Sequence, residues 1–127
     1  MIHTSLSIGL ILGLLIIVPA CDYGTPVGEA PKGDSALMAP VGSTGRMDND
    51  EGVGHYKQGH WDVAEGHFQK AIKADPNLAE ARYNLGLTLD KMGKHDAATA
   101  AFKKAVELAP ANPAIKDSEI LKKHTGM

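Results

Sequence analysis

The side chains with the most evident capacity for chemistry are six histidines in a chain of 127 residues. Imidazole is a common zinc ligand, and helical zinc motifs place two histidines close together on one face. His55, His60 and His67 are the most closely grouped, but a predicted turn separates His60 from His67. No two histidines have i, i+3 or i+4 spacing, and no Cys-x-x-Cys-His haem motif occurs. The sequence therefore predicts no metal site and no cofactor.

Motifs for catalysis are also missing from the sequence. We find no glycine-rich phosphate loop, no Gly-x-Ser-x-Gly elbow and no His-Glu-x-x-His motif. A net charge of −2 and an aromatic content of 5% do not suit nucleic acid, which selects basic surfaces and stacking side chains. We expect neither an enzyme nor a nucleic-acid-binding protein, and the length allows one small domain with appendages.

The lone cysteine, Cys21, follows an apolar stretch over residues 6–20. This stretch has the features of a secretory signal peptide spanning residues 1–20, and it is short for a membrane-spanning helix, which needs roughly 20 residues. A single thiol in an exported protein is unusual unless it is blocked.

The residues Val18-Pro19-Ala20-Cys21 resemble a bacterial lipobox. The resemblance implies cleavage before Cys21, lipidation of its sulfur and acylation of the new amine. It implies an exported lipoprotein, anchored to a cell-envelope membrane and facing the periplasm or the exterior. An uncleaved signal anchor is the alternative, and it too holds the protein at a membrane.

Residues 22–47 contain five glycines and three prolines, with no helical or alternating apolar pattern. Such a composition buries too little surface to offset the entropy of ordering the chain. We therefore predict that residues 21–47 are a lipidated cysteine followed by a flexible linker, and that residues 48–127 fold.

The folded half carries an internal repeat with an offset of 34 residues. Seven identities recur at this offset, namely Gly52/Gly86, Gly59/Gly93, Asp62/Asp96, Ala64/Ala98, Phe68/Phe102, Ala71/Ala105 and Pro76/Pro110. A period of 20–50 residues indicates one supersecondary unit stacked on copies of itself.

The unit and its period resemble the tetratricopeptide repeat, a helix–turn–helix module that holds peptides or proteins. The resemblance implies an all-α solenoid of two helix–turn–helix repeats plus a C-terminal capping helix. Capping boxes are predicted at Asp48 with Glu51 and at Asp62 with Glu65. Asn112 is the predicted N-cap of a last, continuous helix that runs to about Lys123, with Pro113 at its first position.

The concave groove of this family is lined mainly by the first helix of each repeat. By position, the resemblance implies a partner-binding groove made of Asn49, Val53, Tyr56, Lys57, Tyr83, Asn84, Leu87, Asp90 and Lys91. These side chains could hold an extended or helical peptide, with amides fixing its backbone. For Tyr83 and Asn84, a purely structural role in the repeat is the alternative.

Two functions follow from these expectations. The first is a membrane-tethered scaffold that binds a protein or peptide partner in the bacterial cell envelope. The second is a pilotin-like lipoprotein that self-associates as an assembly subunit of a pilus or secretin machine. Two repeats fall short of the three that a stable array usually needs. We therefore expect a homo-oligomer, or completion by a partner, through the uncovered face of the first repeat.

Overall fold

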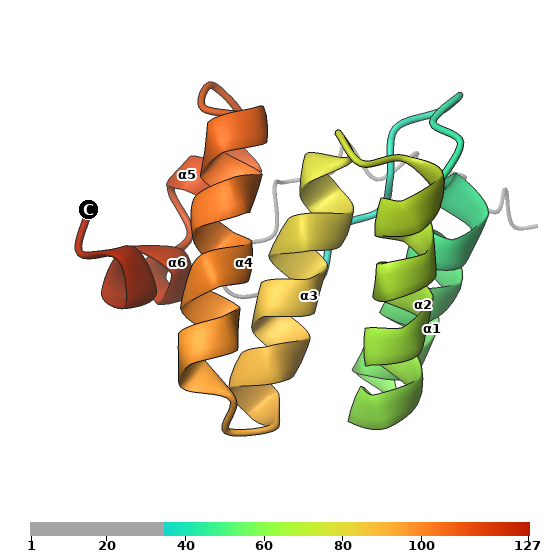
Figure 1. Cartoon of the computed structure of the whole chain (residues 1–127), viewed down its shortest axis with the longest axis horizontal. Coiled ribbons are helices and arrows are strands. Elements are labelled where there is room, and N and C mark those ends of the chain that lie inside the picture. Colours follow the sequence, from blue (N-terminus) through green and yellow to red (C-terminus); the bar gives the residue numbers. More distant parts are fainter. Residues whose placement is uncertain (1–34) are drawn as a thin grey trace, which may run out of the picture.

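The computed structural model describes residues 35–127 as two antiparallel helix pairs followed by two short helices (Figure 1). The long helices are α1 (Arg46–Lys57), α2 (Trp61–Ala74), α3 (Ala79–Lys91) and α4 (His95–Leu108). The short ones are α5 (Pro113–Lys116) and α6 (Glu119–Thr125). The predicted all-α solenoid of two repeats is confirmed. Within this part of the chain, no helix has the length and apolar character needed to cross a bilayer.

Each repeat is closed by the same contact between a glycine and a phenylalanine. A β-carbon on Gly52 of α1 would lie 2.7 Å from the ring of Phe68 in α2, and one on Gly86 of α3 would lie 2.6 Å from Phe102 in α4. Both phenylalanines are fully buried. The paired helices can approach this closely only because the position facing the ring has no side chain.

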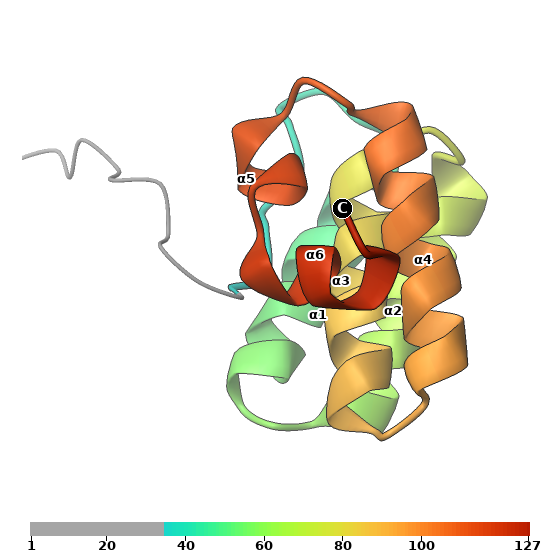
Figure 2. The ribbon, with the colours of Figure 1, turned by 90° about the vertical axis from the view of Figure 1, so that its left-hand side faces the viewer.

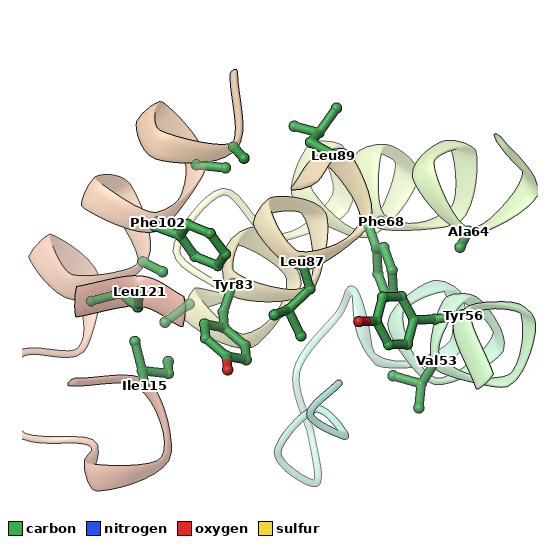
Figure 3. Packing of buried hydrophobic residues seen from close by; sticks show 14 residues of the cluster. Val53, Tyr56, Ala64, Phe68, Tyr83, Leu87, Leu89, Phe102, Ile115 and Leu121 are labelled. Carbon is green, nitrogen blue, oxygen red and sulfur yellow. The ribbon is translucent and has the colours of Figure 1, made fainter. Parts of the chain in front are cut away.

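The turns within the repeats also follow the sequence. Gly59 and Gly93 adopt φ values of 78° and 76°, the left-handed conformation that favours glycine after a helix. The main hydrophobic core runs through both repeats into the C-terminal helices, where Tyr83 and Phe102 lie beside Ile115 and Leu121 (Figure 3).

The predicted capping boxes are wrong. Helix α1 begins at Arg46 and α2 at Trp61, so Asp48 and Asp62 lie inside the first turns, and neither N-cap residue makes a side-chain hydrogen bond. The two carboxylates can still interact favourably with the positive end of each helix dipole.

The single continuous capping helix is also wrong. Asn112 does cap α5, accepting a hydrogen bond from the backbone N–H of Ala114, but α5 ends at Lys116. Ser118 then restarts the chain as α6 by accepting from the N–H of Leu121. The break lets Ile115 and Leu121 both enter the core, fully buried, from two separate short helices.

The flexible linker was expected to reach residue 47, but residues 35–45 belong to the folded domain. They lie on the side of the molecule where α1 and α5 are found, away from α2 and α4 (Figure 2). Ala39 is buried in a small core cluster with Ala71, Leu78 and Ala81, and Leu37 packs against the main core. The prediction failed because these small apolar side chains find a preformed surface that composition does not reveal. Residues 1–34, including Cys21 and the predicted signal peptide, lie outside the described residues.

Candidate functional site: a groove filled by its own chain

The predicted groove holds a segment of the same chain, residues 35–40, which we call the groove segment. The side-chain amide of Asn84 on α3 contacts both polar groups of one backbone residue. Its Oδ1 accepts from the N–H of Leu37 at 2.7 Å, and its Nδ2 donates to the carbonyl of Leu37 at 2.7 Å. Asn84 is itself completely buried. An amide bound in this way recognises the peptide backbone and not a particular side chain.

The first repeat holds the same segment two residues further along. Asp50 on α1 accepts from the N–H of Ala39 at 2.9 Å. Asn49 donates to the carbonyl of Leu37 at 2.9 Å, and its Oδ1 accepts from Asn84 at 2.9 Å. Alternate N–H groups of an extended chain point in the same direction, so Leu37 and Ala39 can present theirs to two neighbouring helices.

Asp50 was missing from the predicted groove, although the sequence contained a signal for it. It stands 34 residues before Asn84, so the two acceptors occupy the same position in successive repeats. The prediction carried over Asn49 as the amide of the first repeat and did not apply the offset to Asn84.

The ionisation of Asp50 depends on these contacts. Partial burial alone would raise its pKa, but hydrogen bonds from Ala39, Asn49 and Arg46, together with the Arg46 charge, outweigh burial and lower the pKa below the ordinary 3.8. The carboxylate form is therefore the one that the docked segment stabilises.

The other predicted groove residues fall into three environments. Val53, Tyr56 and Leu87 are buried in the core, whereas Lys57 and Lys91 are exposed. Tyr83 is covered by the C-terminal helices, and its hydroxyl donates to Ser118 at 2.9 Å. Asp90 turns toward two histidines that the groove prediction did not include.

Asp90 accepts hydrogen bonds at the junction of three helices. Its Oδ1 lies 3.0 Å from Nδ1 of His95 and 2.9 Å from Nε2 of His124. Burial raises the pKa of Asp90, but the hydrogen bonds and charges of His124 and His95 outweigh that effect and lower it. Local spacing could not reveal this cluster, because His95 and His124 are far apart in the sequence.

The three histidines considered as a metal site do contact one another. His55 stacks on His67 with ring centroids 5.3 Å apart, and His60 lies 5.7 Å from His55. Among residues 35–127, however, the groups whose ligand atoms converge are Asp90 with His95 and His124, and Asp48 with Glu51 and His67.

Comparison with known proteins agrees with the repeat geometry. The tetratricopeptide repeat family matches residues 49–113, which is half of the chain. The chain is also 33% identical over 99 residues to Protein bimA from Emericella nidulans. That alignment covers 72% of this chain but only 12% of the relative, so this similarity concerns the repeats and not the whole of the larger protein.

Proposed function

We propose, from the premise that this chain belongs to the tetratricopeptide repeat family, that it is a membrane-tethered scaffold of the bacterial cell envelope. It binds a protein partner through an extended segment of that partner. The repeats themselves indicate a protein-interaction scaffold. The membrane tether and the form of the partner are the parts that we add.

The observation that supports an extended partner is the way in which Asn84 and Asp50 hold the groove segment. Both side chains bind backbone groups, so the same contacts suit any extended segment that fits the surface. Leu37 and Ala39 pack against apolar residues of the repeats. A partner segment should therefore carry small or apolar, uncharged side chains at the corresponding positions.

Binding of such a partner requires the groove segment to leave. Because the segment is attached to the domain, it competes at an effective concentration on the order of millimolar. The partner must make additional contacts to overcome this competition, and the exposed Lys57 and Lys91 offer charged ones beside the groove positions. Removal of the resident segment should strengthen binding in trans.

The test uses the full chain in detergent with residues 35–40 replaced by alternating glycine and serine. A fluorescent peptide with the sequence of residues 34–44 serves as the probe in an anisotropy titration. We expect saturable binding to the replaced chain and at least about tenfold weaker binding to the wild type, whose own segment competes.

Matched variants identify the site of binding. Asn84→Ala in the replaced chain should abolish peptide binding, whereas Lys103→Ala, an exposed change on α4, should not affect it. Far-UV circular dichroism checks that each variant keeps its helices. Equal binding by the Asn84→Ala and Lys103→Ala chains would show that the groove is not the peptide site.

The tether is tested at Cys21. Metabolic labelling with an alkyne fatty acid in a bacterial host should label the wild type, and Cys21→Ser should lose both the label and membrane association, because acyl chains provide the anchor. A Cys21→Ser chain that stays in the membrane fraction, beside an unlabelled wild type, would support the uncleaved signal anchor instead.

The second candidate function is a self-associating assembly subunit. Two large apolar side chains of the first helix pair support it, since Met47 is 84% exposed and Val63 is 46% exposed. Contacts between copies through this face should make sedimentation depend on concentration, and a Met47→Asp/Val63→Asp double variant should remain monomeric. A wild-type monomer at all concentrations would exclude this function.

A further inference from the structure

We propose that Asp90, His95 and His124 form a binding site for a divalent transition-metal ion such as Zn²⁺. The three residues come from the end of α3, the start of α4 and the end of α6. Their ligand atoms all lie within 4.8 Å of one another. Two imidazoles and one carboxylate are a donor set that suits Zn²⁺ and its neighbours among the first-row metals.

The separations need little adjustment to accept an ion. Oδ1 of Asp90 lies 3.0 Å from Nδ1 of His95 and 2.9 Å from Nε2 of His124. Ligands about 2.0 Å from a tetrahedral ion are about 3.3 Å apart, so each distance must grow by only about 0.3 Å. His95 is 66% exposed at its side chain, which leaves a route for the ion and room for water as a fourth ligand.

His124 is held in an orientation suited to a ligand. Its side chain is only 9% exposed, and its ring lies 5.3 Å from the ring of Phe102. Nδ1 lies 3.0 Å from Oγ1 of Thr99. A proton on Nδ1 that is donated to this hydroxyl leaves the Nε2 lone pair directed toward Asp90. Metal-binding histidines generally have such a partner on their second nitrogen.

The repeat itself provides an independent comparison. At the same positions, 34 residues earlier, the first repeat has Tyr56 and Trp61, whose rings meet edge to face at 5.1 Å. The second repeat replaces this apolar contact with Asp90 and His95, and a third element adds His124. Closing the turn between paired helices does not require ligand residues, because the first repeat closes it with two aromatic rings.

The second convergent group, Asp48 with Glu51 and His67, differs in the respects that matter. It has one imidazole, and Nδ1 of His67 lies 3.7 Å from each carboxylate. We propose no site there, and His67 serves as the matched control.

The test is calorimetric titration of the metal-stripped full chain in detergent with Zn²⁺, beside visible absorption spectra with Co²⁺. We expect one strong Zn²⁺ equivalent, a raised thermal midpoint and Co²⁺ absorption bands of a low-coordinate site. His95→Gln and His124→Gln should each remove the strong equivalent. Thr99→Val should weaken it by roughly 10-fold or more, as loss of an outer-shell partner usually does.

Two outcomes would overturn the proposal. One is the lack of any strong Zn²⁺ equivalent in the wild type, which would leave the cluster as hydrogen bonds only. The other is a strong equivalent that persists in His95→Gln or is lost in His67→Gln, which would place the ion elsewhere. His95 is exposed, so its substitution tests the site even if His124→Gln fails to fold.

Discussion

At the residue scale, the pairs Gly52/Phe68 and Gly86/Phe102 decide how closely the helices of each repeat approach. The hydrogen at each glycine is replaceable only if the facing phenylalanine moves, since a β-carbon would lie 2.7 Å or less from its ring. Both rings are fully buried and cannot move into solvent. A repeat that keeps the phenylalanine must therefore keep the glycine.

This contact predicts opposite effects for two glycine-to-alanine changes. Gly86→Ala should lower the free energy of unfolding by about 1–3 kcal/mol, the usual cost of overpacking a core. Gly54→Ala on α1 should raise it by up to about 1 kcal/mol, because nothing lies within 4 Å of the added carbon and alanine favours the helix. Urea unfolding followed by circular dichroism measures both. A Gly86→Ala variant as stable as the wild type would contradict the close-approach argument.

At the element scale, the groove segment behaves as a part of the fold that local sequence does not define. Its residues have no helix or strand pattern, and its order depends on side chains of α1 and α3. The contact between Asp50 and the N–H of Ala39 can be tested through pH, because the docked segment lowers the pKa of Asp50.

A group whose folded pKa is lowered contributes stability above its unfolded pKa and loses it as the pH falls through the folded value. The stabilisation from Asp50 should therefore be present at neutral pH and disappear below the ordinary value of 3.8. Asp50→Asn keeps an acceptor for Ala39 but removes the charge, so it should cost about 1 kcal/mol at neutral pH and nothing in acid. Urea midpoints at both pH values measure this. A stability difference independent of pH would show that the charge has no part in docking.

The break between α5 and α6 is a second feature at this scale. Ser118 caps α6 and accepts from the hydroxyl of Tyr83 in the buried core. Ser118→Ala should lower the unfolding free energy by about 1–2 kcal/mol through loss of the cap and of the buried hydrogen bond. Ser118→Thr, which can retain both, is the control. Equal loss of stability in both variants would assign the effect to packing.

At the scale of the whole molecule, the two repeats form one cooperative unit. The main core is continuous from Val53 to Leu121, and Asn49 of the first repeat bonds Asn84 of the second. Solenoids of few repeats unfold as one when the interface between neighbours is this extensive.

The single tryptophan, Trp61, reports on the first repeat alone. Its fluorescence transition in urea should coincide with that of circular dichroism, and Gly86→Ala in the second repeat should shift both equally. A fluorescence transition that stays in place while circular dichroism shifts would show that the repeats unfold independently.

The sequence by itself determined the repeat, its period and the helix pairs. The signals for these are local: apolar residues at helical spacing, Gly59 and Gly93 at the turns, and prolines after α2 and α4. The groove positions were identified by the same periodicity, apart from Asp50. The helix starts and the continuous capping helix were predicted wrongly, because capping residues also occur inside first turns and between short helices.

Only the tertiary structure decided what occupies the groove and what surrounds Asp90. Docking of residues 35–40 depends on Asn84, 47 residues from Leu37, and the cluster at Asp90 depends on His124, 34 residues away. Neither pair shares a helix or a repeat unit, so no periodicity relates them. They meet because stacking of the repeats and return of the C-terminal helices set their relative positions in space.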